Sequence, residues 1–205
     1  MLQILGRKTS GNTQKVLWCC DELGIAYERE DVGRGFGRNH EPAYLALNPN
    51  GRIPTIVDDG FSLWESNVIV RYLCAKHGMG TLCPSEPQRR ADAERWMDWQ
   101  QTTLRPRFHA LSDALQKTSP TPPDKTVLKS LEKTLCDAWQ ILDAQLAKQS
   151  YVAGGNLTMA DIPFCYVIHR WYKLPVEHIG FTNLKAWYEM LCERPAFRRN
   201  ICEVE

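Results

Sequence analysis

A Glu–Ser pair at residues 65 and 66 stands directly before an apolar segment with helical spacing, residues 68–73. A serine at a helix start is a ready N-cap, and the backbone N–H groups beside it lie at the positive end of the helix dipole. Such a position can receive a small carboxylate. Glu65 adds a fixed negative charge that suits an ammonium group next to that carboxylate. Glu65 and Ser66 therefore predict either a site for a zwitterionic ligand or a plain helix cap beside a solvated acid.

Two short strands and a tight turn must position this pair. Pro54 opens a β-branched run, an Asp-Asp-Gly turn follows at residues 58–60, and a second short strand leads into the Glu–Ser pair. Only X-Pro bonds reach the cis form at a modest cost of about 0.5–1 kcal/mol. Pro54 is therefore either a cis proline or an ordinary trans proline at the start of an edge strand.

This arrangement resembles the glutathione S-transferases, whose thioredoxin-like domain carries a cis-proline before one strand and a Glu/Gln–Ser pair after the next. The resemblance implies that Pro54 is cis and that the backbone of Ile53 pairs with the cysteinyl part of glutathione like one more strand edge. It also implies that Glu65 and Ser66 bind the γ-glutamyl end, which is such a zwitterion. Glutathione would then be the co-substrate.

The loop before the first helix extends the resemblance. Thioredoxin relatives hold a redox cysteine there, whereas this chain has Ser10 and Asn12, in the Ser-x-Asn pattern of theta-, beta- and nu-like bacterial glutathione transferases. A free thiol has a pKa of about 8.5, and a hydrogen-bond donor at a helix N-terminus lowers that pKa by favouring the thiolate. A hydroxyl and an amide can each donate. We expect the catalytic donor to be Ser10 first, Asn12 second, and Thr9 behind both.

The remaining pattern of the first domain predicts a strand at residues 2–5, a helix at about 13–23 closed by Gly24, a strand at 26–32 and a short irregular helix at 42–49. In the family this irregular helix leads to the cis-proline. Its polar residues could face the glycyl end of glutathione, with Asn48 and Arg52 as the candidates.

Composition excludes several functional classes. The chain has 205 residues, 43% of them apolar, and a formal net charge of +1, which argues against a nucleic-acid partner. No apolar run of the length that a membrane span needs is present, and no signal peptide is expected. The eight cysteines show neither a C-x-x-C motif nor zinc spacing, so we expect no metal and a reduced, cytoplasmic protein. Cys19 and Cys20 fall inside the first helix and are expected to be core residues.

A second, all-helical domain follows a proline-bearing linker. We place the first domain at residues 1–80, the linker at 81–87 and the helical domain at 88–205. Thr158, followed three residues later by Asp161, forms a capping-box pattern, which in the family begins a buried helix and is structural. The fold class is therefore an α/β thioredoxin-like domain plus an all-α domain. The resemblance also implies a homodimer.

In this fold the second substrate binds between the first loop and the helical domain, in a mostly apolar pocket. Arg107 and Phe108, at a bend of the helical domain, and Tyr166, on the buried helix, are the wall candidates. A cation at Arg107 could stabilise negative charge that develops on an aromatic electrophile.

The resemblance implies a detoxification enzyme that conjugates the thiolate of reduced glutathione to small electrophiles. A glutathione-dependent disulfide reductase or peroxidase on the same fold is the first alternative, because nu-like members carry a similar Thr-x-Asn loop. A ring-cleavage isomerase is disfavoured because the Ser-Ser-Cys loop of those relatives is missing. A non-enzymatic scaffold is the remaining alternative, since fold alone does not fix function.

Overall fold

Four short strands form one mixed sheet in the computed structural model, which describes residues 1–116, 124–178 and 180–204. The strands are β1 (Leu2–Leu5), β2 (Tyr27–Glu30), β3 (Thr55–Asp58) and β4 (Phe61–Trp64), in the order β2-β1-β3-β4. β1 pairs parallel to β2 and antiparallel to β3, and β3 pairs antiparallel to β4. Ile4 and Ile56 lie opposite each other at the centre, and both are fully buried.

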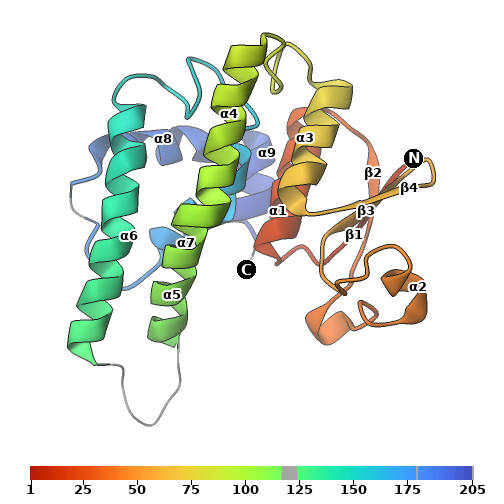
Figure 1. The fold of residues 1–205 in the computed structure, drawn as a ribbon, viewed down its shortest axis with the longest axis horizontal. Helices are drawn as coiled ribbons and strands as arrows, with labels where there is room; N and C mark the ends of the chain where they lie inside the picture. The colour runs from red at the N-terminus through yellow and green to blue at the C-terminus, as the bar shows by residue number, and fades with distance from the viewer. Residues whose placement is uncertain (117–123, 179, 205) are drawn as a thin grey trace.

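Two helices of the first half lie between this sheet and the rest of the molecule (Figure 1). They are α1 (Gly11–Glu22) and α3 (Ser66–His77), and they pack against each other. The short helix α2 (Pro42–Leu45) and the 3₁₀ turn η1 (Arg34–Phe36) belong to the segment between β2 and β3. The thioredoxin-like arrangement predicted from the sequence is confirmed. The expected start of α1 at about residue 13 was wrong by two residues, because Ser10 occupies the N-cap position.

The second half is helical, as predicted. Its elements are α4 (Pro87–Trp99), η2 (Gln100–Leu104), α5 (Arg105–Gln116), α6 (Lys125–Leu146), η3 (Ile162–Phe164), α7 (Cys165–Trp171), α8 (Thr182–Cys192), α9 (Pro195–Phe197) and η4 (Arg198–Cys202). Figure 1 shows α4 and α5 as one long rod beside α6, with α7 behind them.

The rod stays continuous through Pro106 because η2 is one turn of π-helix. Proline has no N–H. In an α-helix the carbonyl of the residue four positions before it therefore has no N–H to accept from. Here the N–H of Arg105 reaches back to the carbonyl of Gln100, five residues away, and the widened turn absorbs the proline. Beyond this turn, α5 packs against α6 and α7.

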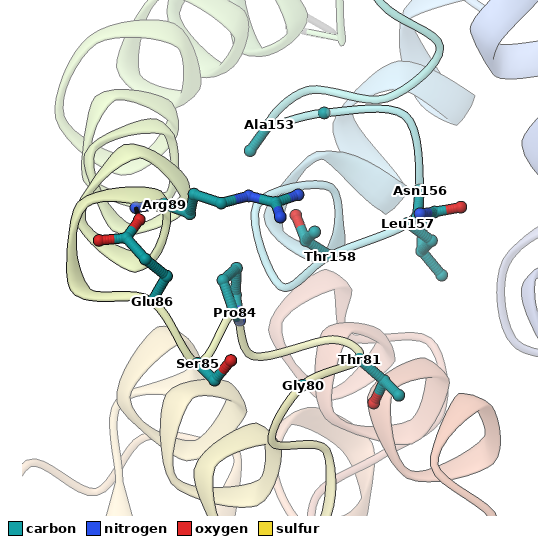
Figure 2. Close-up of a pocket in the computed structure, with 11 residues that line it drawn as sticks. Gly80, Thr81, Pro84, Ser85, Glu86, Arg89, Ala153, Asn156, Leu157 and Thr158 are labelled. Carbon is teal, nitrogen blue, oxygen red and sulfur yellow. Dashed lines mark hydrogen bonds between the residues drawn. The ribbon is translucent and has the colours of Figure 1, made fainter.

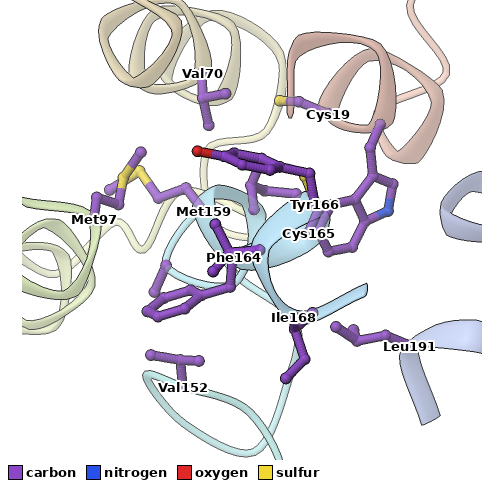
Figure 3. Close-up of a cluster of buried hydrophobic side chains, with 14 of the residues drawn as sticks. Cys19, Val70, Met97, Val152, Met159, Phe164, Cys165, Tyr166, Ile168 and Leu191 are labelled. Atoms are coloured by element: carbon purple, nitrogen blue, oxygen red, sulfur yellow. The ribbon is translucent and has the colours of Figure 1, made fainter. Parts of the chain in front are cut away.

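One buried cluster joins the two halves of the chain (Figure 3). It contains Cys19 of α1, Val70 of α3, Met97 of α4, and Phe164 with Cys165 at the start of α7. The α1 cysteines are thus core residues. Burial raises the pKa of the neighbouring Cys20 to about 12, which keeps that thiol protonated. We conclude that α1 belongs to the core of both domains.

The far end of α1 is also fixed to the second half. The ring of Trp18, fully buried, meets the ring of Phe197 edge-on, with centroids 4.9 Å apart. The carboxylate of Glu22 accepts a hydrogen bond of 2.8 Å from Nε1 of Trp18 and another of 2.8 Å from Nε of Arg194. Glu22 is 9% exposed, so this ion pair is largely shielded from solvent.

The hydrogen bonds expected of the Thr158–Asp161 capping box form, but a turn and η3 separate the box from α7, and Asp161 reaches further than a local cap. Oδ2 of Asp161 accepts from the Thr158 backbone N–H at 3.0 Å, and Oδ1 accepts from the Val152 N–H at 2.9 Å and the Trp187 indole N–H at 3.1 Å. Burial raises the pKa of Asp161 to about 6, and these donors act in the opposite direction by stabilising the charged form. Asp161 therefore ties α7 to a preceding loop and to α8.

We predict that Asp161→Asn lowers the free energy of unfolding by about 1–3 kcal/mol, because an amide NH₂ replaces an acceptor and leaves a buried N–H donor unpaired. Urea denaturation followed by tryptophan fluorescence measures the change. Asp137→Asn is the control. Among the described residues Asp137 pairs only with Lys133, on the surface of α6, so the substitution should change stability by less than about 0.5 kcal/mol. Equal effects of the two substitutions would contradict the structural role of Asp161.

Candidate functional site

The Ile53–Pro54 peptide bond is cis, as the family resemblance implied, and Pro54 is buried directly before β3. The loop that leads to it is fixed from within. Nδ2 of Asn48 donates to the carbonyl of Arg52 at 2.7 Å and to the hydroxyl of Thr55 at 3.1 Å. The hydroxyl of Tyr44 donates to the same Arg52 carbonyl at 2.6 Å.

The two candidates for the glycyl end of glutathione therefore lie in different surroundings. Asn48 is 2% exposed, and its Oδ1 also accepts from the backbone N–H of Asn50 at 3.0 Å. The side-chain amide of Asn48 therefore stabilises the conformation of the loop. The side chain of Arg52 is exposed, so Arg52 remains the candidate partner for a ligand carboxylate.

The Glu–Ser pair begins α3 one residue earlier than we expected. Glu65, and not Ser66, is the N-cap residue, and it holds φ 70° and ψ 105°. A positive φ is uncommon for a residue with a Cβ and is found repeatedly at ligand sites. This conformation leaves the Glu65 side chain exposed and without a capping hydrogen bond, while Ser66, 5% exposed, opens the first turn. The N-cap prediction for Ser66 was wrong because it ignored this backbone turn.

Ser10 is the N-cap of α1, and its side chain makes no capping hydrogen bond to the helix. Asn12 lies in the first turn and is half-buried. Between them, Gly11 packs directly on the ring of Tyr166 from α7. A Cβ at position 11 would lie 2.4 Å from Cγ of Tyr166, which is far inside contact distance. The Ser-x-Asn pattern of this chain therefore requires glycine at its middle position.

Cations surround Tyr166. Nε of Arg105, on α5, donates to the tyrosine hydroxyl at 2.9 Å. The guanidinium of Arg170 lies 5.4 Å from the ring centroid and also donates to the carbonyl of Thr9 at 3.3 Å. Nζ of Lys15 lies 5.7 Å from the same centroid. Such a set of positive charges around the N-terminus of α1 suits an anionic ligand.

Burial and the nearby cations both lower the pKa values of neighbouring basic groups. Burial lowers the pKa of Arg7, and the nearby Arg34 and Arg170 lower it further. Burial also lowers the pKa of His109, whose Nε2 lies 3.5 Å from the hydroxyl of Tyr166, and Arg105 acts in the same direction. The loop 6–10 and the facing side of α5 and α7 thus form an electropositive region.

Arg107 and Phe108 lie apart from this region. Arg107 donates to the carbonyl of Thr134 on α6 at 3.2 Å, and Phe108 is 1% exposed within the core. Arg105 and His109 approach Tyr166 instead, because residues four apart share one helix face and residue 107 points elsewhere. Helical spacing places Arg105 and His109 on one face of α5, but the sequence does not show that this face is the one that meets Tyr166.

One hollow adjoins the site, and a larger one is lined by other residues. A pocket of about 180 Å³ adjoins the loop and is lined by Thr9, Gln14, Tyr166, His169, Arg170, Lys173, Ile201 and Val204. A larger one, about 340 Å³, lies between the segment 80–89 and the loop 153–158, with Arg89 extended across it (Figure 2). None of the predicted site residues lines the larger hollow. In the described part of the chain, no cluster of three metal-binding side chains is present and no helix has the length and apolarity of a membrane span.

Comparison with known proteins identifies the family. The family model "Glutathione S-transferase, N-terminal domain" matches residues 9–76, and "Glutathione S-transferase, C-terminal domain" matches residues 96–195. Glutathione S-transferase GstB of Escherichia coli (strain K12) is 40% identical over 202 residues, which cover 97% of this chain and 97% of that relative. The chain belongs to the glutathione S-transferase family.

Solved glutathione transferase structures agree with this assignment. The theta class glutathione S-transferase from the citrus canker pathogen Xanthomonas axonopodis pv. citri, with glutathione bound, superposes with a TM-score of 0.89 at 40% identity over 98% of this chain and 96% of that chain. Glutathione transferase F7 from Populus trichocarpa gives a TM-score of 0.85 at 25% identity, with 97% of each chain covered.

We predict that Gly11→Ala destabilises this glutathione transferase by about 1–3 kcal/mol, because the new methyl group overlaps the Tyr166 ring and forces either α1 or α7 to shift. An alanine in an unobstructed helix would stabilise it instead. Gly35→Ala is the matched control, since nothing lies within 4 Å of a Cβ built there. The midpoint of urea unfolding is the measurement, and a Gly11→Ala protein as stable as the control would exclude the close packing.

Proposed function

We propose that this enzyme adds the thiolate of reduced glutathione to electrophilic, mostly apolar small molecules. The observation that carries the proposal is the hydroxyl of Ser10, which stands at the N-terminus of α1 without a helix-capping bond. A ligand sulfur placed there meets a hydrogen-bond donor and the positive end of a helix dipole. Both favour the thiolate over the thiol, and no protein nucleophile is needed.

Glutathione would lie along the first domain, residues 1–80. Its γ-glutamyl carboxylate would accept from Ser66 and the first N–H groups of α3, and its ammonium group would face the exposed carboxylate of Glu65. The backbone of Ile53, before the cis-proline, would pair with the cysteinyl residue. Arg52 would meet the glycyl carboxylate, and Asn48 would hold the loop that presents it.

Charge balance supports the thiolate. Bound glutathione carries two carboxylates and one ammonium group, so its ionised thiol adds a second net negative charge. Arg105 and Arg170 face the same region from the helical half of the chain. In a site partly shielded from water these cations lower the free energy of the anionic form.

The electrophile would bind beside Tyr166, against the pocket that Thr9 and Arg170 also line. Tyr166 offers an apolar ring and a hydroxyl held by Arg105. Negative charge that develops on an aromatic electrophile would be stabilised by this tyrosine–arginine pair. We assign that role to Arg105, because Arg107 is directed to α6.

We further propose that the enzyme works in the cytoplasm as a homodimer that detoxifies electrophiles. All eight cysteines are free thiols, as in proteins of a reducing compartment. Two large apolar side chains, Phe61 (52% exposed) and Val68 (43% exposed), border a hollow of about 380 Å³ between β4, α3 and α4. A second copy of the chain would cover this face.

Removal of the Ser10 hydroxyl tests the chemistry. We expect Ser10→Ala to raise the pKa of the bound thiol toward its free value of about 8.5 and to lower kcat for an aromatic halide by about 10²–10³-fold. Thiolate absorbance, titrated against pH at saturating glutathione, measures the pKa. Asn12→Ala should have the smaller effect, and the reverse order would assign the donor to Asn12.

The binding residue supplies the matched control for that experiment. Ser66→Ala should weaken glutathione binding about tenfold, because a hydrogen bond to a charged group is lost, and leave the pKa of the bound thiol unchanged. Activity toward glutathionylated disulfides with none toward aromatic halides would favour the reductase. If the protein does not bind glutathione at millimolar concentration, the non-enzymatic scaffold would be the remaining hypothesis.

Replacement of Phe61 tests the dimer. We expect Phe61→Ser to halve the mass measured by light scattering at micromolar concentration, because it removes the largest exposed apolar group of the face. Val127→Ser on α6 is the control, since Val127 is equally exposed at 52% but lies on the other half of the molecule. A monomeric wild type, or a dimer that survives Phe61→Ser unchanged, would contradict this interface.

A further inference from the structure

A lysine is fully buried behind the Glu–Ser pair. Lys15 lies on the second turn of α1 and has no exposed surface. Its Nζ donates to Oδ1 of Asn67 at 3.1 Å and approaches Oγ of Ser66 at 3.5 Å. Asn67 is held in turn by its own Nδ2, which donates to the carbonyl of Met97 at 3.1 Å. The ammonium group therefore contacts the first two residues of α3 from the side opposite the solvent.

This ammonium group lacks a carboxylate partner. Within the described residues, no Asp or Glu oxygen lies within 4.0 Å of Nζ of Lys15. Burying an unpaired charge is costly, and proteins retain such groups mostly at functional sites. Burial lowers the pKa of Lys15 to about 7, so the lysine is only partly charged near neutral pH in the free protein.

The groups that face Lys15 come from three directions. They are Glu65 before α3, Arg105 and His109 on α5, and Cys165 and Tyr166 on α7. Glu65 favours the charged lysine and Arg105 opposes it. The pKa of Cys165 is raised to about 12 and that of His109 is lowered, so above pH 7 both stay neutral. Lys15, whose pKa is about 7, is therefore the group of this set that changes charge near neutral pH.

We propose that Lys15 is a positioning residue of the glutathione site, which holds Ser66 and Asn67 at the start of α3 and takes up a proton when the γ-glutamyl carboxylate binds. The inference rests on the proposed function, because it needs a ligand carboxylate at Ser66. A carboxylate that accepts from the Ser66 hydroxyl would lie within about 6 Å of Nζ, a separation at which an opposite charge stabilises the ammonium form.

The sign of the pH dependence follows from this coupling. The free protein loses the Lys15 proton as the pH rises through about 7, whereas the complex keeps that proton to a higher pH. The complex thus binds more protons than its components, and affinity falls as the pH rises above 7, by up to about tenfold per pH unit. The thiol of glutathione acts in the opposite direction, because it releases a proton when it binds as the thiolate. Proton uptake by Lys15 and proton release by the thiol must therefore be measured separately.

S-methylglutathione separates them, since it keeps both carboxylates and the ammonium group but has no thiol proton. Titration calorimetry at pH 7.5 in two buffers of different ionisation enthalpy gives the number of protons taken up per ligand bound. For the wild type we expect about half a proton or more at pH 7.5 and nearly none at pH 6.

Two substitutions separate the charge from the hydrogen bond. Lys15→Met removes both and should abolish the uptake and weaken binding. Lys15→Gln keeps a donor for Ser66 without a titrating charge, so it should abolish the uptake and retain more affinity than Lys15→Met. Lys185→Met, at an exposed position on α8, should match the wild type in both readouts.

A measurement on the wild type tests the role of Lys15 even if the variants fail to fold. In [¹³C]lysine-labelled protein, one ε-carbon resonance should titrate near pH 7 and move to a higher pH with S-methylglutathione. Binding without proton uptake, or uptake that persists in Lys15→Met, overturns the role of Lys15 alone. If S-methylglutathione fails to bind the wild type at millimolar concentration, the proposed function falls and this inference falls with it.

Discussion

The packing of the Tyr166 ring on Gly11 holds the N-terminus of α1 between the two halves of the chain. Ser10 precedes this contact, Asn12 follows it, and Lys15 lies one turn further along the same helix. The position of every group that would act on the thiol therefore depends on how α7 meets α1. The capping box before α7 matters for the same reason, since Asp161 fixes the segment that carries Tyr166.

Positive charge is concentrated at this contact, and its repulsion and burial lower the stability of the free protein. Arg105, Arg170 and Lys15 surround one tyrosine, and the pKa values of Arg7 and Lys15 are lowered by burial. A ligand with two carboxylates and a thiolate would supply the negative charge that this arrangement lacks. The same unfavourable electrostatics that weaken the free protein would thus favour the complex.

The sequence predicted the parts of the site that are encoded locally. The cis-proline, the two strands around the Asp-Asp-Gly turn and the capping box each lie within a few consecutive residues, and all are present. It did not predict the contact of Gly11 with Tyr166 or the burial of Lys15, because these depend on how distant helices pack. Arg107 was preferred to Arg105 because the face of α5 that meets α7 cannot be read without its partner.

The sharing of α1 between two cores also limits how such a protein can be divided or recombined. The C-terminal half of α1 packs Trp18 against Phe197 and pairs Glu22 with Arg194, so it is matched to the last helices of this chain. A first domain produced alone would expose an indole ring and an unpaired carboxylate to solvent and would tend to aggregate. A chimera that joins this first domain to the helical domain of a relative would need a complementary surface at these positions. The smallest part of this chain that we expect to fold and to be exchanged between relatives is therefore the pair of domains.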